Sequence, residues 1–211
     1  EHSGVTLFDT RHEQAAVFMA EAWGKMTRTP GVAMVTAGPG FTNSLTAVAS
    51  AFFSNTPLVI IAGCVGLDCK EKLDLQDMPQ QAVIAPMVKK ALVCHKPGRI
   101  AEYVDMAFRT ASSGRPGPVY LEFPVDVLNA QVDSESIKTP STAVYSRPAD
   151  PAGAEQMLEM IQKAKNPVVI AGTGAWQSGA GDELAQFIEQ THMPVFTSLS
   201  ARGLIADDHP L

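Results

Sequence analysis

The feature that most constrains the fold is an apolar run at residues 57–67, which contains no charged side chain. The run is too short to cross a bilayer, because a spanning helix needs about 20 apolar residues. Runs of this kind are typical of strands that are buried on both faces, as in the centre of a parallel sheet. The sequence therefore predicts a sheet that is covered by helices on both sides.

Predicted strands and helices alternate along the first part of the chain. Strands are expected near residues 4–8, 32–36, 57–62, 91–94 and 118–123, and helices near residues 12–28, 43–54, 79–86 and 99–112. Regular alternation of this type indicates βαβ units. We therefore predict an α/β fold in which a parallel sheet carries helices on both faces.

The character of the sequence changes at residues 129–150, which are polar, contain prolines and show weak periodicity. These properties are typical of a linker that crosses a surface. A second alternating unit follows, with helices expected near residues 153–164 and 182–190 and strands at residues 167–171 and from residue 195. We predict a first domain at residues 1–128, a linker at residues 129–150 and a partial second domain at residues 151–211.

Composition and charge exclude several functional classes. Hydrophobic residues make up 45% of the 211 residues, charged residues make up 18%, and the formal net charge is −6, which indicates a globular protein. Nucleic-acid binding would need a clustered basic face, and no membrane contact is expected. The cysteines at 64, 69 and 94 form no CxxC pair, and the five histidines lack metal-ligand spacing. We expect reduced thiols, no metal ligands and a cytoplasmic protein.

A carboxylate and a glycine-containing turn are predicted to lie at the same edge of the sheet. Glu13 follows the strand expected at residues 4–8, and residues 37–43 follow the strand expected at residues 32–36. In open parallel sheets, ligands bind at the carboxyl ends of the strands. Glycine at positions 38 and 40 would let the backbone approach a ligand closely. A cofactor site is the leading hypothesis, and a P-loop is excluded because no Gly-Lys-Ser/Thr follows.

Each of these features also has a purely structural interpretation. A carboxylate in the first turn of a helix, such as Glu13, is favoured by the helix dipole alone. Burial among apolar neighbours would raise its pKa unless something hydrogen-bonds to it, and a carboxyl group with a raised pKa can pass a proton to a ligand nitrogen. Thr42 or Asn43 would simply cap the next helix. Gln76 would lie in an ordinary surface loop.

The second unit contains a weaker glycine pattern at Gly172 and Gly174. Gln177 stands where the dinucleotide-binding sequence GxGxxG needs its third glycine. A plain tight turn is therefore the simpler interpretation. A nicotinamide-dependent oxidoreductase, suggested only by the βαβ pattern, is a weak alternative.

Several segments together resemble the pyrimidine-binding domain of thiamine-diphosphate enzymes. The matching segments are residues 11–16, 35–43, 113–119 and 123–127, and their order and spacing also match. Residues 202–210 resemble the start of the central domain of that family. The branch that the chain resembles contains acetolactate synthases, 2-hydroxyacyl-CoA lyases, oxalyl-CoA decarboxylases and benzaldehyde lyase. The resemblance implies that residues 151–211 begin a Rossmann-like central domain.

The resemblance also implies roles for individual residues. The glutamate that matches Glu13 hydrogen-bonds a ring nitrogen of the cofactor's aminopyrimidine and so activates the thiazolium carbon toward a carbonyl. The residues expected to lie beside the pyrimidine are Pro39, Gly40 and Asn43. The residues expected on the substrate side are Phe41 and Gln76, of which Gln76 is also expected to act in catalysis.

The resemblance implies an enzyme that makes or breaks a carbon–carbon bond next to a carbonyl. We first expect an acetolactate-synthase-like carboligase with a 2-oxo acid donor. Phe41 and Leu75 resemble the pocket of benzaldehyde lyase, and residues 78–80 resemble hydroxyacyl-CoA lyases, so a lyase of 2-hydroxyacyl-CoA or of an acyloin is the alternative. A non-catalytic binding or assembly module that retains the fold is an alternative of another class.

In the family, a Gly-Asp-Gly…Asn segment of a C-terminal domain holds the diphosphate and its Mg²⁺, and residues 1–211 contain no such segment. We therefore expect this chain to supply no metal ligand and to be inactive by itself. The family places the cofactor between subunits, which implies a homodimer or homotetramer. Whether the central domain binds FAD or the ADP part of CoA is left open by the sequence.

Overall fold

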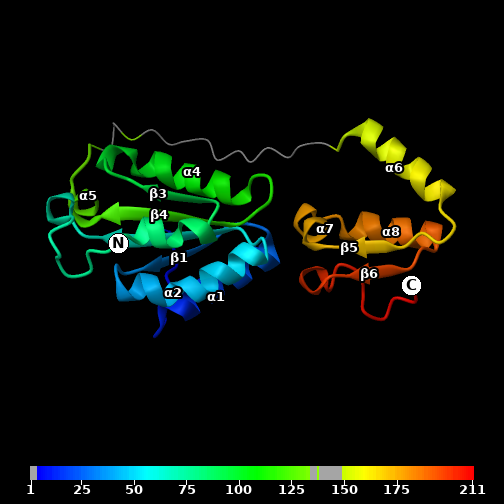
Figure 1. Ribbon diagram of the computed structural model, residues 1–211, viewed down its shortest axis with the longest axis horizontal. Coiled ribbons are helices and arrows are strands. Elements are labelled where there is room, and N and C mark those ends of the chain that lie inside the picture. The colour runs from blue at the N-terminus through cyan, green and yellow to red at the C-terminus, as the bar shows by residue number, and fades with distance from the viewer. Residues whose placement is uncertain (1–3, 134–136, 138–148) are drawn as a thin grey trace. The chain divides into compact units, whose positions relative to one another are not determined.

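The computed structural model of the chain describes residues 4–133, 137 and 149–211 (Figure 1). The chain forms two compact units, residues 1–144 and residues 145–211. Each unit contains a parallel sheet of its own. The linker predicted at residues 129–150 lies largely outside the described residues, and each unit is therefore described by itself.

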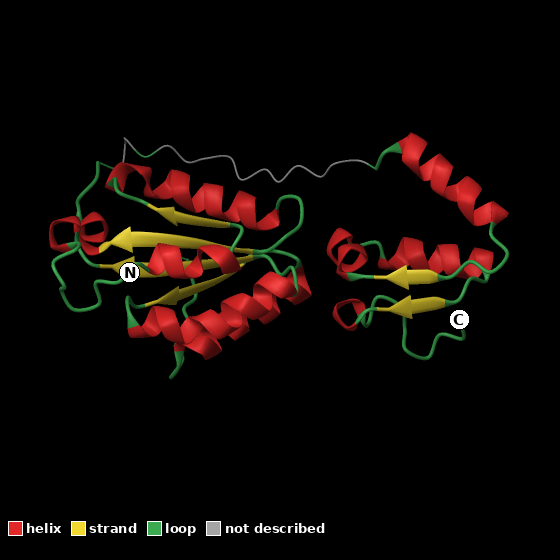
Figure 2. Ribbon diagram, in the orientation of Figure 1, coloured by secondary structure: helices red, strands yellow, loops and turns green. Residues whose placement is uncertain are grey.

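The first unit is built on a four-stranded parallel sheet in the order β1-β2-β4-β3 (Figure 2). Its strands are β1 (Gly31–Val35), β2 (Leu58–Cys64), β3 (Lys90–Val93) and β4 (Pro118–Pro124). The two central strands are the most deeply buried, and every residue of β4 is buried. The prediction of a buried parallel strand in the apolar run at residues 57–67 is confirmed.

Helices cover both faces of this sheet, as the sequence predicts. The α-helices of the first unit are α1 (Glu13–Thr27), α2 (Pro39–Phe53), α3 (Gln80–Ile84), α4 (Ile100–Ser112) and α5 (Val125–Asn129). Leu58 and Ile60 of β2 pack in one core cluster with side chains of α1, α2 and α3. Val59, which points to the opposite face, packs in a second cluster with α4. The alternation of side chains along a strand therefore divides the core into two layers.

The second unit contains a two-stranded parallel sheet of β5 (Val169–Ala171) and β6 (Val195–Thr197). Its α-helices are α6 (Pro151–Lys163), α7 (Thr173–Ser178) and α8 (Gly181–Thr191). Within the described residues, the short 3-10 helices are η1 (Leu67–Cys69), η2 (Ala85–Met87), η3 (Pro97–Arg99) and η5 (Leu199–Ala201). The plain turn predicted at residues 172–174 is wrong, because Gly172 is the N-cap of α7 and Gly179 ends that helix in the left-handed conformation.

Two other boundary predictions are corrected by the structure. Residues 4–8 are not a strand in the structure, and Val5, Leu7 and Phe8 are exposed. An apolar run favours a strand where its side chains are buried on a sheet, and these side chains are not buried. Helix α2 begins at Pro39, four residues before the predicted start, because proline suits the first helical position.

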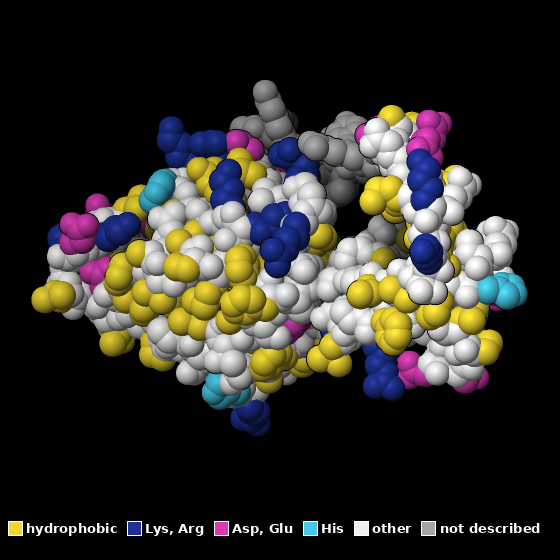
Figure 3. All heavy atoms as spheres, turned by 45° about the vertical axis from the view of Figure 1, so that its right-hand side comes forward, with side chains coloured by type: hydrophobic (Ala, Val, Ile, Leu, Met, Phe, Trp, Pro, Cys, Tyr) yellow, Lys and Arg dark blue, Asp and Glu magenta, His cyan; other side chains and the backbone are white. Residues whose placement is uncertain are grey.

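Helix α1 exposes most of its large apolar side chains and, apart from Glu21, which accepts hydrogen bonds from Ser50 and Ser54, buries smaller ones. Its buried face contains Val17, Ala20 and Gly24. Met19, Trp23 and Met26 are more than half exposed, at 52%, 60% and 70%. Figure 3 shows apolar side chains gathered on one face of the first unit. The small residues let α1 approach the sheet closely, while its large apolar residues contribute little to the core of this unit.

The close approach of α1 to β1 depends on Gly31. A Cβ atom at this position would lie 1.9 Å from the backbone oxygen of Ala20 in α1. We predict that Gly31→Ala lowers the free energy of unfolding by about 1–3 kcal/mol, because the helix must move to relieve the overlap. Thermal or urea denaturation measures the change. Gly98→Ala is the control, since a Cβ there meets no atom within 4 Å, and equal stability of the two variants would contradict this packing.

Candidate functional site

Glu13 lies in the first turn of α1 and faces the start of α2. Its Oε2 atom accepts a hydrogen bond of 3.1 Å from Nδ2 of Asn43. The N-cap is the preceding residue, His12, whose Nδ1 atom accepts from the backbone N–H of Gln14. The carboxylate of Glu13 is therefore not used as the helix cap, and it is directed instead to a neighbouring helix.

The pKa of Glu13 is lowered from its ordinary value. The main cause is the hydrogen bond from Asn43, which stabilises the charged carboxylate, and a backbone hydrogen bond adds to it. Desolvation acts in the opposite direction but is outweighed, because the side chain is only partly buried. Burial alone would raise the pKa of Glu13. The hydrogen bond from Asn43 outweighs that effect, so the pKa is lowered instead.

Gly40 lies directly against this carboxylate. A Cβ atom at position 40 would be 3.1 Å from Oε1 of Glu13 and 2.6 Å from Cγ2 of Thr36. Any side chain at this position would displace Glu13 or Thr36, so glycine is required by close approach. Pro39, its neighbour, is the exposed first residue of α2. The structure thus brings together four predicted site residues: Glu13, Pro39, Gly40 and Asn43.

The turn before α2 has an unusual backbone at Gly38. This residue has φ +64° and is the N-cap of α2, which has no side-chain cap. The prediction that Thr42 or Asn43 caps this helix is wrong, because Thr42 Oγ1 donates to the oxygen of Pro39 and Asn43 donates to Glu13. A Cβ at position 38 would lie 3.0 Å from Cγ of Gln76. Gln76 therefore packs against the turn.

A cavity of about 530 Å³ opens at the carboxyl edge of the sheet. Its walls include Thr36 after β1, residues 63–66 at the end of β2, and Gln76. Gln76, which adopts φ +69°, also lines a smaller cavity of about 160 Å³. Of the predicted site residues, Gln76 lines this cavity, whereas Glu13, Pro39, Gly40 and Asn43 are not part of its walls.

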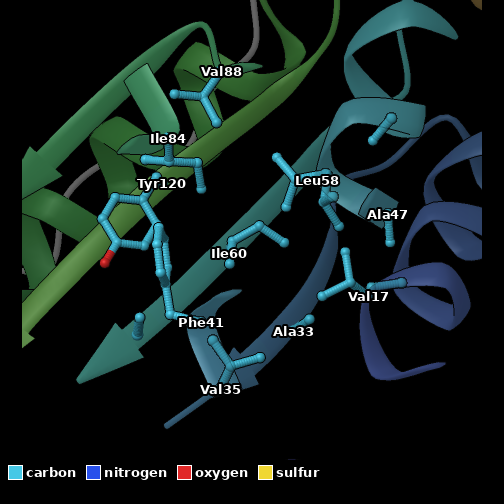
Figure 4. Close-up of a cluster of buried hydrophobic side chains, with 14 residues drawn as sticks. Val17, Ala33, Val35, Phe41, Ala47, Leu58, Ile60, Ile84, Val88 and Tyr120 are labelled. Atoms are coloured by element: carbon cyan, nitrogen blue, oxygen red, sulfur yellow. The ribbon is translucent and has the colours of Figure 1, made fainter. Parts of the chain in front are cut away.

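Phe41 does not reach either cavity wall. Its side chain is fully buried, and its ring packs edge-on against Tyr120 with 5.5 Å between the ring centroids (Figure 4). The expected substrate-side position therefore differs from the position in the structure, where Phe41 is a core residue. The reason is its place on α2, because the side chain points toward the sheet and packs in the same cluster as Ala47 and Val48.

Sequence reasoning missed Asp126, which lines the large cavity. Its Oδ2 atom accepts from the backbone N–H of Leu67 at 3.1 Å, and Oδ1 accepts from the N–H of Val127 at 3.0 Å. Asp126 thus ties the loop after β2 to the start of α5. Asp126 could have been identified from its position just after a buried strand, in the same way that the strand predicted at residues 4–8 drew attention to Glu13.

Cys64 lines both cavities but is not suited to act as a nucleophile. Burial and the nearby Glu122 raise the pKa of its thiol to about 12. A thiol with this pKa is protonated near neutral pH, whereas the thiolate is the reactive form. Among the described residues, no group of three or more His, Cys, Asp or Glu side chains is placed to hold a metal ion. The same part of the chain contains no helix that is long and apolar enough to span a membrane.

The link between Asn43 and Glu13 gives a prediction about pH. We expect Asn43→Ala to raise the pKa of Glu13 toward its ordinary value, because the carboxylate loses its main donor. In the native protein this donor stabilises the fold at a pH above the unfolded-state pKa, and the contribution is lost as the pH falls through the lower folded-state pKa.

NMR titration of the Glu13 carboxyl carbon measures this change. Glu102 of α4 is the internal control, because Arg99 lowers its pKa independently of Asn43. A Glu13 pKa that is unchanged in the alanine variant would show that Asn43 is not its donor in solution.

Comparisons with known proteins agree with this geometry. Residues 1–84 match the family model "Thiamine pyrophosphate enzyme, N-terminal TPP binding domain", and residues 154–211 match the model of the central domain of the same enzymes. Thiamine pyrophosphate is another name for thiamine diphosphate. The first matched segment contains Glu13, Gly40, Asn43 and Gln76.

Curated relatives extend the match over nearly the whole chain. The acetolactate synthase large subunit of Mycobacterium tuberculosis is 36% identical over 212 residues, which cover 99% of this chain and 38% of the relative. A probable acetolactate synthase large subunit of Methanococcus aeolicus is 34% identical, with 100% and 36% covered. Oxalyl-CoA decarboxylase of Escherichia coli is 32% identical, with 99% and 38% covered.

The chain therefore spans 36–38% of the length of these relatives. Its two family matches follow one another in the order N-terminal domain, then central domain. Together with the parallel sheet and the cavity at its carboxyl edge, these matches show that the chain belongs to the thiamine-diphosphate-dependent enzymes, in the branch that includes the acetolactate synthases.

Proposed function

We propose that the protein containing this chain makes or breaks a carbon–carbon bond next to a carbonyl, as an acetolactate-synthase-like carboligase with a 2-oxo acid donor. The observation that carries the proposal is the carboxylate of Glu13, held by Asn43 and packed against Gly40 at the start of α2. Family membership and the names of the relatives support the same chemistry.

The residues present fit the aminopyrimidine ring of thiamine diphosphate. Gly40 lets the Glu13 carboxylate lie directly against the start of α2, because a Cβ atom there would be 3.1 Å from Oε1 of Glu13. A carboxylate held in one orientation by an amide donor suits a heterocycle with a nitrogen at its edge. When bound, thiamine diphosphate supplies the electron sink for the carbanion that carbon–carbon bond chemistry requires.

In this proposal the chain contributes Glu13, which holds one proton, and Asn43, which keeps the Glu13 carboxylate in position. Glu13 would hydrogen-bond the ring nitrogen of the pyrimidine and share a proton with it, and its lowered pKa favours the ionised carboxylate before the ring is bound. Asn43 limits rotation of that carboxylate through the bond to Oε2. Gln76, which reaches both cavities, is placed to contact the substrate, and Leu75 adds an apolar wall to the larger cavity.

A second candidate activity is the cleavage of an acyl-CoA or acyloin substrate. The similarity to oxalyl-CoA decarboxylase favours this candidate, since that relative matches 99% of the chain at 32% identity. Under either proposal we expect Mg²⁺ ligands outside residues 1–211, a homodimer or homotetramer, and a cytoplasmic location. FAD and the ADP part of CoA are both candidates for the central domain.

The proposal predicts the effect of Glu13→Gln in the full-length protein. Glutamine keeps the size of the side chain but cannot take up the proton, so activation of the thiazolium carbon is expected to fall by about 10²–10⁴-fold. Hydrogen–deuterium exchange at that carbon, followed by NMR after an acid quench, measures activation independently of the substrate.

The matched control is Glu102→Gln, which removes a carboxylate from an exposed ion pair on α4. Exchange at the native rate in the Glu13 variant would refute the proposed role. Loss of exchange in both variants would instead indicate general damage to the protein.

Gln76 gives a separate prediction about specificity. We expect Gln76→Ala to change the ratio of kcat/KM between pyruvate and an acyloin or 2-hydroxyacyl-CoA substrate by about tenfold, because it removes a polar group from the cavity wall. Exchange at the thiazolium carbon is expected to stay near the native rate, because alanine keeps the Cβ atom that packs near Gly38. An unchanged substrate profile would place Gln76 outside the substrate site.

A further inference from the structure

Gln80 is a buried polar residue that none of the functions described above uses. It is the first residue of α3 and only 1% exposed. Its Oε1 atom accepts a hydrogen bond of 2.8 Å from the backbone N–H of Gly38. The Nε2 atom lies within bonding distance of the backbone oxygen of Gly63, at 2.9 Å. The carboxamide therefore joins the turn before α2 to the end of β2.

The same nitrogen also reaches the end of β4. Nε2 lies 3.1 Å from the hydroxyl of Tyr120 and 3.2 Å from Oε2 of Glu122. The Tyr120 hydroxyl donates to Glu122 at 2.6 Å. Three acceptors thus surround the NH₂ group, whereas the carbonyl oxygen faces a backbone donor. This chemistry fixes the orientation of the amide, since a flipped carboxamide would place oxygen against oxygen.

The contact with Gly38 is the one that bears on the site. Gly38 has φ +64° and lies two residues before Gly40, which packs against the Glu13 carboxylate. A buried backbone N–H without a partner is costly, so Gln80 holds the turn in the conformation that satisfies this donor. Gln76 packs on the same glycine, in the direction that a Cβ atom would occupy. The turn is thereby clamped between two residues of the segment that follows β2.

We propose that Gln80 is a positioning residue for activation of the cofactor: it fixes the Gly38 turn and, through Gly40, the placement of Glu13. This inference rests on the proposed function. The hydrogen bonds of the Gln80 side chain go to Gly38, Gly63, Tyr120 and Glu122 and not to Glu13, so its effect on Glu13 passes through the backbone of residues 38–40. The nearby Tyr120 and Glu122 hold the amide in place.

The test compares three variants of the full-length protein. Gln80→Met keeps the length of the side chain but removes both hydrogen-bonding ends, and we expect exchange at the thiazolium carbon to fall about tenfold. Tyr120→Phe loses one acceptor of the Gln80 amide but leaves the bond to Gly38, so exchange is expected near the native rate even if the melting temperature drops. Gln156→Met, on the exposed face of α6, is the surface control.

A second readout needs neither cofactor nor activity. Backbone hydrogen exchange, measured by mass spectrometry on a peptide spanning residues 34–41, is expected to show a protected Gly38 amide in the native protein. Gln80→Met is expected to lose that protection, and Tyr120→Phe is expected to keep it. The native protein by itself tests the hydrogen bond from the Gly38 N–H to Gln80, so this readout can still contradict the proposal if Gln80→Met does not fold.

The outcomes separate this inference from the proposed function. Loss of exchange at the thiazolium carbon in Glu13→Gln but not in folded Gln80→Met would overturn the positioning role alone. Retention of exchange in Glu13→Gln would overturn the proposed function itself. An equal loss in Gln80→Met and Tyr120→Phe would show that core stability is the cause, and a Gly38 amide that is unprotected in the native protein would show that the clamp is absent.

Discussion

The contact between the start of α1 and the start of α2 is the constraint on which the candidate site depends. Glu13 can meet Asn43 only because the two helices converge above the same face of the sheet. Two glycines make that approach possible because they have no Cβ atom. Gly31 lets α1 pack closely on β1, and Gly40 lets the Glu13 carboxylate contact α2. Glycine acts here through close approach, whereas at Gly38 it acts through positive φ.

The parallel sheet determines which loops meet at this contact. All four strands point the same way, so the segments after β1, β2 and β4 reach one edge. Gly38 follows β1, whereas Gly63 and Glu122 lie near the carboxyl ends of β2 and β4, and Gln80 joins all three through a single carboxamide. A buried amide with every group paired favours one arrangement of the edge over others. The hydrogen bonds of Gln80 to the ends of the central strands therefore fix the position of the turn at Gly38.

The sequence predicted the α/β class and the four strands of the sheet, because these follow from apolar runs and alternation, but it also predicted a strand at residues 4–8 that the structure does not form. The prediction that Glu13 lies at the same edge as residues 37–43 relied on that strand and therefore did not follow from the topology alone. The sequence did not predict the burial of Phe41, since side-chain direction depends on where α2 begins, and Pro39 moved that start by four residues. Periodicity also could not choose the buried face of α1, which is apolar nearly all round. Packing selected the face with the small residues Ala20 and Gly24.

The direction of the Glu13 pKa shift helps to decide between a structural and a chemical role. A carboxylate that served only the helix dipole would need no partner from another helix, and His12 already caps α1. Glu13 instead receives an amide donor from α2, which favours its ionised form. That amide favours the negatively charged carboxylate, for which a ring nitrogen carrying a proton would be an electrostatically matched neighbour. A helix cap would not require an amide donor from a second helix, and the proposed proton exchange with a bound heterocycle rests on this pairing.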